Sequence, residues 1–372
     1  MRILMLGPHP TIRGPLPKHT PHLVAALRNL GCSVALEPWG RRHDQEKLRD
    51  KLMQRGPDIL RVRRRLQKER FDVLVVKTAH DWATLSRDIP LLLATRRLCP
   101  CIVLQFHGGV PDRLLAPGRP LFKLASGILV RLADAGLLLS SEERQQWQQF
   151  YSAGRFFTVS NPFVPPGAAP AQLDRRQLRL PADVPVLLFV GRIMKEKGVL
   201  ELVSALPTVL AHTACHLHIV GDGPLTQEIR GRLNAAGIAD RVTLSGYVEG
   251  DALWGVYRTA DIFVLPTWTE GFSVSLTEAM AAGLPVVTTG IRGMADHLRD
   301  GVHAVFVAPR DPAALADALV RVLADPALRA RMRAANTQKV REFSPEIVGC
   351  QYLDVLRQIV APPVQRTTTC AA

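Results

Sequence analysis

The fold is decided by the segment ADIFVLPTWTEGFSVSLTEAMAAGLPVV, residues 260–287. It begins with an apolar run, ADIFVLP (260–266), and ends in a second run that continues as LPVVTT to residue 289. Both runs have the length and composition of buried strands. The stretch between them is a polar loop followed by a helical pattern. This order of strand, helix and strand is typical of a parallel sheet with crossover helices.

The same alternation repeats outward in both directions. Polar, helix-period segments separate most of the short apolar runs. We therefore predict two doubly wound, Rossmann-like α/β domains that face each other across a cleft. Ligands of such sheets bind at the carboxyl ends of the strands, so the cleft is the expected site. The predicted strands are 2–7, 32–36, 71–76, 101–106, 136–140 and 156–161 in the first round, and 184–191, 215–221, 241–246, 260–266, 284–289 and 302–307 in the second.

The sequence also predicts where the domains divide. The segment PFVPPGAAPAQL (162–173) is rich in proline, glycine and alanine without an apolar period, which indicates a linker. A chain of 372 residues is also too long for one typical core. The predicted parts are a first domain (1–164), a linker (165–183), a second domain (184–344), a carboxyl-terminal helix for which we consider packing on the first domain (345–361), and a disordered tail (362–372).

The composition favours a soluble cytoplasmic protein. No stretch of about 18 residues lacks charge, and the nearest candidate, 121–139, contains Lys123, Arg131 and Asp134. The apolar run at the start is too short for a signal peptide and is better interpreted as a first buried strand. The six cysteines are scattered without zinc-ligand spacing, so we expect reduced thiols.

The charge is uneven along the chain. Residues 1–180 contain 29 Lys+Arg against 14 Asp+Glu, a net charge of +15, whereas the rest of the chain has a net charge of −1. A basic half can attract nucleic acid, anionic lipid or a phosphorylated substrate. Its densest part, 61–65, is equally well explained as a solvated helix face. Only 6% of the residues are aromatic and no nucleic-acid motif occurs, which argues against nucleic acid.

Two glutamates in the deciding segment are candidates for ligand binding. Glu270 and Glu278 lie eight positions apart, and the helix is expected to begin between Ser273 and Ser275. Glu278 has a structural explanation, because Ser275 to Glu278 fits a capping box worth about 1 kcal/mol. Glu270 precedes the helix and is not explained in this way. An acceptor-only side chain there suits the hydroxyls of a sugar, and Gly271 allows the backbone to pass close to a ligand.

A second candidate is the loop GRIMKEKG, 191–198, which follows a predicted strand and precedes a helix. Arg192 and Lys197 are two cations beside a helix amino terminus, where backbone amides add hydrogen-bond donors. This arrangement suits a diphosphate. A solvated basic turn is the equally weighted alternative for the motif taken alone.

Together, GRIMKEKG, VGDGP (220–224) and the deciding segment resemble the carboxyl-terminal domain of retaining glycosyltransferases of the GT-B fold. The resemblance is to glycosyltransferase family 4, also called glycosyl transferases group 1, whose E-x7-E signature is matched by Glu270 and Glu278. The similarity covers roughly 184–324. Weaker echoes in the first half are GPHPTIRGPLPKH near the start, FHGG (106–109), LADAGLLLSSEE (132–143) and SNPF (160–163).

The resemblance implies roles for individual residues. Glu270 would contact the donor sugar and His107 would lie near the reacting centre, as the two catalytic candidates. A histidine satisfied within a turn is the alternative for His107. The residues implied in donor binding are Gly14, Arg192, Lys197, Tyr247, Val248, Gly271, Phe272, Ser273 and Glu278, with Glu278 on the ribose and Tyr247 and Val248 beside the base.

The sequence departs from the family pattern in two places. Relatives often have a pair of glycines before His19, where this chain has Gly14 and Pro15, and proline lacks an amide. After the strand ending at 289, relatives often have paired glycines and Pro-Glu, where this chain has GIRGMAD (290–296). Both departures bear on the phosphate and sugar contacts.

The resemblance implies glycosyl transfer with retention, from a nucleoside diphosphate sugar to a glycan or lipid-linked acceptor of bacterial envelope or exopolysaccharide synthesis, such as lipopolysaccharide. We expect no metal, because Arg192, Lys197 and helix amides can stabilise the leaving diphosphate and no Asp-x-Asp occurs. The basic first half would bind the acceptor at an anionic membrane, peripherally on the inner face of the cytoplasmic membrane. The alternatives are an epimerase or a non-catalytic scaffold on the same fold. The sugar, base, acceptor and oligomeric state stay open.

Overall fold

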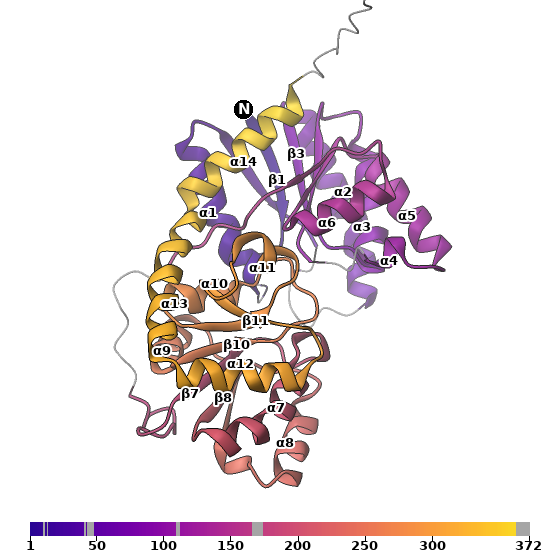
Figure 1. The fold of residues 1–372 in the computed structure, drawn as a ribbon. Helices are drawn as coiled ribbons and strands as arrows, with labels where there is room; N and C mark the ends of the chain where they lie inside the picture. Colours follow the sequence, from indigo (N-terminus) through magenta and orange to yellow (C-terminus); the bar gives the residue numbers. More distant parts are fainter. Residues whose placement is uncertain are drawn as a thin grey trace, which may run out of the picture. The chain divides into compact units, whose positions relative to one another are not determined.

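The computed structural model describes residues 1–9, 12, 14–40, 42, 48–108, 112–165 and 174–361. The chain forms two compact units (Figure 1). Unit 1 consists of Met1–Leu139, Glu143–Pro162 and the chain from Pro345 onward, and unit 2 consists of Ser140–Glu142 and Phe163–Ser344. The chain therefore enters unit 2 after Pro162 and returns to unit 1 after Ser344. Residues 166–173 of the predicted linker (165–183) and the whole predicted tail, 362–372, lie outside the described residues.

Within the described residues, unit 1 is built on a sheet of six parallel strands in the order β2-β1-β3-β4-β5-β6. Its four inner strands are buried along nearly all of their length, and three of them are rich in valine, isoleucine and leucine, as expected for a parallel sheet covered on both faces, whereas the two edge strands are only partly buried. The six strands are β1 (Arg2–Gly7), β2 (Ser33–Pro38), β3 (Val73–Thr78), β4 (Ile102–Phe106), β5 (Ala135–Leu138) and β6 (Phe156–Thr158).

The helices of unit 1 cover two faces of this sheet. On one face, α1 (Pro15–Asn29) and α14 (Pro345–Val360) share a core with the alternate side chains Ile3, Met5, Val73, Val75 and Val103. Helices α1 and α14 pack closely, because a Cβ added to Gly349 would stand 2.8 Å from the Ala26 Cβ. The other face is covered by α2 (Leu48–Lys68), α3 (Trp82–Thr95), α5 (Pro120–Arg131) and α6 (Ser141–Phe150), with the short α4 (Asp112–Leu115) before α5.

Unit 2 repeats the architecture with six described parallel strands in the order β12-β11-β10-β7-β8-β9. One continuous apolar core surrounds the sheet. The strands are β7 (Val186–Val190), β8 (His216–Val220), β9 (Val242–Gly246), β10 (Ile262–Leu265), β11 (Val286–Thr289) and β12 (Ala304–Val307). The helices are η1 (Lys195–Lys197), α7 (Val199–His212), α8 (Thr226–Ala235), η2 (Ala239–Arg241), α9 (Gly250–Thr259), α10 (Val274–Ala281), α11 (Arg292–His297), α12 (Pro312–Ala324), α13 (Pro326–Lys339) and η3 (Val340–Phe343).

Each sheet has one place where the strand order reverses. In unit 1 the chain moves outward from β1 to β2 and then back across to β3, so the reversal lies between β1 and β3. In unit 2 it lies between β7 and β10. Loops that leave the sheet on opposite sides of such a switch point open a space at the strands' carboxyl ends, where ligands of doubly wound sheets bind. The prediction of two doubly wound α/β domains is confirmed.

Candidate functional site

Two loops meet at the switch point of unit 2. The loop 191–198 follows β7, and the loop 266–273 follows β10. The Glu196 carbonyl accepts hydrogen bonds from the Trp268 amide (2.8 Å) and the Thr267 hydroxyl (2.9 Å). Gly198 allows this contact, because a Cβ there would stand 1.9 Å from the Pro266 carbonyl oxygen and its φ is +69°. The two candidate motifs are therefore joined through their backbones.

This junction brings Lys197 and Glu270 together. The Lys197 ammonium forms a hydrogen-bonded ion pair with the Glu270 carboxylate. The two side chains are 21% and 20% exposed, so the pair is partly shielded yet accessible to a ligand. A cation and an acceptor-only group held side by side can bind the charged and the hydroxyl parts of one polar molecule.

Glycines of the VGDGP segment (220–224) allow close backbone contact with the loop 191–198. A Cβ at Gly221 would stand 1.9 Å from the Gly191 carbonyl oxygen, and one at Gly223 would stand 2.2 Å from that of Ile193. The Ile193 amide also donates to the Asp222 carbonyl (2.9 Å). Within this supported loop the Arg192 side chain is exposed. The loop backbone is thus fixed while Arg192 stays accessible to a ligand.

Two helices begin at this switch point without a side-chain cap. The residue before α7 is Gly198, which has no side chain, and the Ser273 side chain before α10 makes no capping hydrogen bond. The expected helix start near Ser273 is confirmed. The capping-box explanation of Glu278 is wrong, because α10 begins at Val274 and Glu278 is its fifth residue. Free first-turn amides are donors for an anion.

Glu278 is instead held by a tyrosine. The Tyr257 hydroxyl donates to the Glu278 carboxylate at 2.8 Å. Burial raises the pKa of Tyr257 well above its usual value, and the Glu278 charge raises it further. Tyr257 therefore remains protonated and orients the carboxylate. No pattern in the sequence indicates a functional role for Tyr257, because an apolar helix face explains an aromatic residue in α9 equally well.

The segment between the two glutamates contributes mainly backbone. The Gly271 carbonyl accepts from the Gly293 amide at 2.7 Å. The Phe272 ring is buried against Phe343 and His297, with ring centroids 4.9 and 4.8 Å apart. The Ser273 hydroxyl lies 3.0 Å from that of Ser275. Phe272 therefore offers a ligand only its main chain.

Tyr247 and Val248 are not at the Lys197–Glu270 pair. They follow β9, which is two strands from β7, about 10 Å at the usual strand spacing. Tyr247 is 48% exposed and its hydroxyl donates to Glu249 at 2.7 Å, whereas Val248 packs against the core. This spacing suits a ligand that is longer than a phosphate group.

Comparisons with known proteins agree with this geometry. The family model described as glycosyl transferases group 1 matches residues 184–325. A D-inositol 3-phosphate glycosyltransferase of Xylanimonas cellulosilytica is 30% identical over 309 residues, which are 79% of this chain and 68% of that relative. The chain belongs to the group 1 glycosyl transferases.

Two further similarities support the fold of this transferase. An uncharacterized glycosyltransferase of Methanocaldococcus jannaschii is 34% identical over 151 residues, which are 41% of this chain and only 39% of that relative. The solved structure of Anabaena HepE with UDP-glucose has a TM-score of 0.74, is 18% identical, and covers 96% of this chain and 100% of that one. The two doubly wound domains are those of the GT-B fold.

Two predicted site residues of the transferase lie in unit 1. Gly14 precedes α1 with a φ of +132°, and Pro17 removes a further amide from the first turn of that helix. The His107 amide donates to the Thr78 carbonyl at 2.7 Å, which fixes the residue after β4. Burial lowers the pKa of His107 well below its usual value, and the nearby Lys77 and His19 lower it further. His107 is therefore a neutral imidazole at physiological pH.

The described residues contain no group of three or more metal-ligating side chains that could hold a metal ion. The same residues contain no helix long and apolar enough to cross a membrane.

Proposed function

We propose that this transferase moves a hexose from a nucleoside diphosphate sugar, UDP- or GDP-linked, to a glycan or lipid-linked acceptor, with retention of anomeric configuration. The observation that carries the proposal is the meeting of Lys197 and Glu270 at the unit 2 switch point. Switch points of doubly wound sheets are where nucleotides bind. The HepE structure holds UDP-glucose, which supports a UDP donor.

The proposed chemistry depends on stabilising a leaving diphosphate. The bond from the anomeric carbon to the diphosphate breaks, and a bond to the acceptor oxygen forms on the same face. The acceptor proton passes to a diphosphate oxygen. Arg192, Lys197 and the uncapped amides of α7 supply positive charge and donors for the growing negative charge, so the proposed reaction needs no metal.

The two glutamates are assigned to orienting the donor. Glu270, held by Lys197, would accept from sugar hydroxyls, and Glu278, held by Tyr257, would accept from the ribose diol. Tyr247 and Val248 would flank the base at the far end of the same ligand. His107 belongs to unit 1 and is proposed near the reacting centre, as the family resemblance implies.

The test is thermal unfolding of the whole protein with UDP, GDP, ADP, CMP and TDP. A nucleotide at 100 times its Kd should stabilise the wild type by about 2.7 kcal/mol. We expect one diphosphate to do so, and both Lys197→Met and Arg192→Ala to lose the effect. Lys195→Ala, on the same turn as Lys197, is the matched control and should keep it. Equal stabilisation of all variants, or of none including the wild type, would contradict the donor site.

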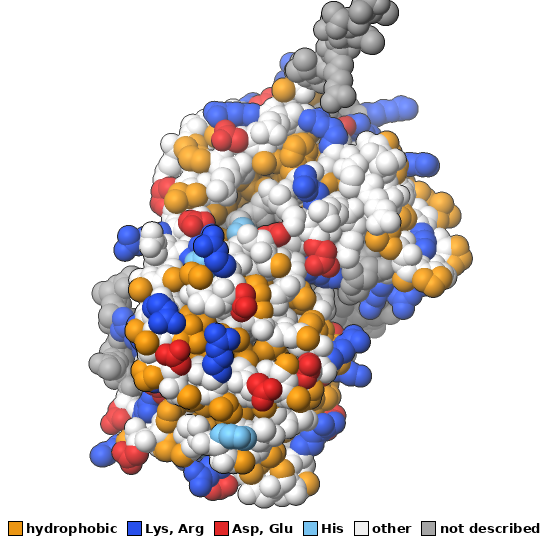
Figure 2. Space-filling model, in the orientation of Figure 1, with side chains coloured by type: hydrophobic (Ala, Val, Ile, Leu, Met, Phe, Trp, Pro, Cys, Tyr) orange, Lys and Arg blue, Asp and Glu red, His pale blue; other side chains and the backbone are white. Residues whose placement is uncertain are grey.

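For the acceptor, the D-inositol 3-phosphate glycosyltransferase relative supports a phosphorylated molecule. A role in bacterial envelope or exopolysaccharide synthesis is proposed from the family resemblance alone. We assign peripheral attachment at an anionic inner membrane to unit 1. Helix α5 carries Leu121, Leu124 and Ile128, 71%, 62% and 39% exposed, next to Lys123. Figure 2 shows hydrophobic and basic side chains together over this helix. Flotation with anionic liposomes at low salt should recover the protein, and its absence from the floated fraction would contradict attachment.

A further inference from the structure

The switch point of unit 1 also holds polar side chains, and they are more deeply buried than those of unit 2. Lys77 is near the end of β3, and its Cα partner on β4 is Gln105. Both alternate onto the sheet face that α1 and α14 cover, where His19 of α1 also lies. The exposed fractions of His19, Lys77 and Gln105 are 7%, 6% and 1%. His107 follows β4 directly, and we name these four residues the basic cluster.

Several buried polar atoms of the basic cluster have no hydrogen-bond partner among the described residues. The Nε2 atoms of His19, Gln105 and His107 are buried without a hydrogen-bond partner. In the described part of the chain no carboxylate pairs with Lys77. Buried donors are nearly always paired, and each unpaired one costs about 1–3 kcal/mol. Three neighbouring side chains with such atoms, next to a lysine that has no described carboxylate partner, point to a missing ligand.

The remaining atoms of the cluster are fixed, so its donors are oriented. The Gln105 Oε1 accepts from the Tyr352 hydroxyl of α14 at 3.0 Å, which leaves the amide nitrogen as the free donor. The His19 ring donates a hydrogen bond to the Pro162 carbonyl through Nδ1, because Nε2 has no partner; Nε2 therefore donates to a ligand only when the ring is protonated. The Lys77 side chain passes the end of β1, since a Cβ at Gly7 would stand 3.6 Å from its Cδ.

The electrostatics of the cluster are unfavourable without a negative group. Burial lowers the pKa of Lys77 to about 7. Burial also lowers the pKa of His19 to about 4, and the neighbouring Lys77 lowers it further. A buried cation without a counter-charge is costly, and the usual remedy is a paired anion.

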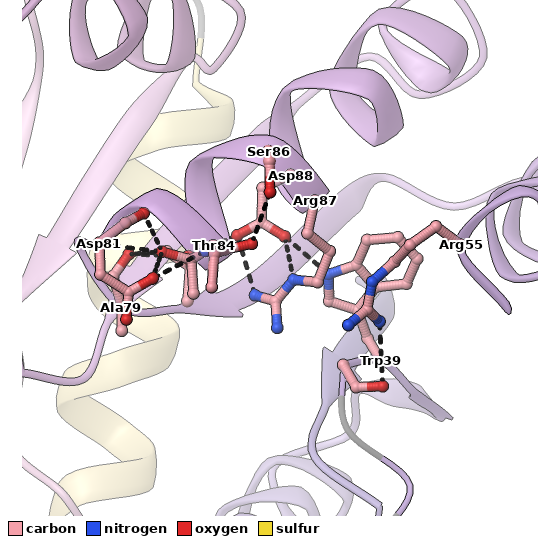
Figure 3. A network of polar contacts seen from close by, with 11 residues as sticks. Trp39, Arg55, Ala79, Asp81, Thr84, Ser86, Arg87 and Asp88 are labelled. Atoms are coloured by element: carbon pink, nitrogen blue, oxygen red, sulfur yellow. Dashed lines mark hydrogen bonds and ion pairs between the residues drawn. The ribbon is translucent and has the colours of Figure 1, made fainter. Parts of the chain in front are cut away.

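The opposite face of the sheet at the end of β3 contains a buried charge, Asp88, whose hydrogen-bond partners all lie within the protein. The residue after Lys77 is Thr78, which donates to the fully buried Asp88 (Figure 3). Asp88 also accepts from the Trp39 indole at 2.8 Å and from Arg87 at 2.6 and 2.9 Å. Every side chain in this network has its partner inside the protein. In the basic cluster, one residue away along β3, the three Nε2 atoms have none among the described residues.

We propose that His19, Lys77, Gln105 and His107 bind an anionic group, a phosphate or a carboxylate, of the acceptor. The Lys77 ammonium, the Gln105 amide and an Nε2–H of His107 can donate to the several oxygens of such a group, and a bound anion favours protonation of His19, which would add a fourth donor. The cluster lies at the unit 1 switch point, where the sheet topology places a ligand. The assignment to the acceptor rests on the proposed function, since the donor diphosphate is assigned to unit 2, whereas the anion site itself does not.

The first test uses sulfate, whose charge is constant between pH 6 and 8. Thermal unfolding of the full chain at pH 6.5 is followed against sodium sulfate, with sodium chloride at matched ionic strength. We expect the apparent Kd for sulfate to be at least tenfold weaker in Lys77→Met than in the wild type. The matched control is Lys68→Met on the exposed end of α2, which should respond like the wild type. Because the proposed diphosphate site of unit 2 can also take sulfate, the titration is repeated in the Lys197→Met background, where Lys77→Met should still weaken the response tenfold or more. Equal sulfate responses in wild type and Lys77→Met, or no response in either, would overturn the proposal and leave the cluster filled by water.

A second variant, Gln105→Glu, supplies the missing negative charge from within. It should raise the melting temperature and weaken the sulfate response as much as Lys77→Met does, because the new carboxylate pairs with Lys77. A Gln105→Glu variant that is stabilised by sulfate as much as the wild type would contradict the site.

Repeating the sulfate titration with saturating UDP separates the sources of the anion. An unchanged sulfate affinity supports the assignment of the basic cluster to the acceptor. Competition by UDP would overturn this assignment and would indicate that the cluster binds the donor diphosphate. If no nucleotide binds but the sulfate response is lost in Lys77→Met, the donor proposal fails and the anion site stands.

Discussion

The two switch points of this transferase place polar groups at the same topological position and treat them differently. In unit 2, Lys197 and Glu270 pair with each other and are about one-fifth exposed. In unit 1, Lys77 is buried without a carboxylate partner among the described residues, and the Nε2 atoms of its neighbours His19, Gln105 and His107 are buried without a hydrogen-bond partner. Polar groups that pair with each other, as in unit 2, do not destabilise the fold when no ligand is bound. Buried polar groups without partners, as in unit 1, lower the free energy of unfolding until a ligand binds. Ligand binding should therefore stabilise the fold more at the unit 1 switch point than at the unit 2 switch point.

The comparison predicts its largest effect at Gly198. Gly198→Ala should destabilise the protein by about 3 kcal/mol, because a Cβ would meet the Pro266 carbonyl at 1.9 Å and the φ of +69° is unfavourable for alanine. Chemical unfolding followed by tryptophan fluorescence measures this. The counterpart Gly7→Ala, beside Lys77 in unit 1, should change stability by less than about 0.5 kcal/mol, because its nearest atoms would be 3.6 Å away. If Gly198→Ala and Gly7→Ala destabilise the protein equally, the tight backbone contact at the unit 2 switch point does not distinguish it from the unit 1 switch point.

A smaller effect is expected from pH at Lys77. Its pKa is lowered from 10.5 to about 7 by burial, so the unfolded chain binds more protons than the folded one between these values. The stability contributed by this residue therefore rises with pH over that window and is lost as pH falls to about 7. In the absence of added anions, the free energy of unfolding of Lys77→Met should be higher than that of the wild type by about 2 kcal/mol at pH 7, and the difference should be smaller at pH 10.

Urea unfolding of Lys77→Met and of the wild type at pH 7 and pH 10 measures this difference in the free energy of unfolding. Groups that titrate equally in both proteins do not contribute to the difference. A difference between Lys77→Met and wild type that stays constant from pH 7 to pH 10 would mean that the amine is already charged and compensated. The contrast between the two switch points would then disappear.

The sequence was sufficient for the fold and for the unit 2 site, because their signals are local. Apolar runs marked the strands, and the loops after two of them contained Arg192, Lys197 and Glu270 in a single short motif each. The capping box failed because a serine two positions too late was taken as the cap, and the backbone begins α10 at Val274. Tyr257, Lys77 and Gln105 could not be found, because their roles depend on strand register and on helices distant in sequence.

The packing of α14 on α1 also determines when each half of the enzyme can mature. Unit 2 is almost one continuous stretch, 163–344, so all of its residues emerge from the ribosome before α14 does. The sheet face of unit 1 is covered in part by Val348, Tyr352 and Leu356 of α14, the last helix of the described chain. That apolar face stays exposed during synthesis until nearly the whole chain has emerged. The amino-terminal half is thus the last to become native, and a chaperone that shields apolar surface would act there longest.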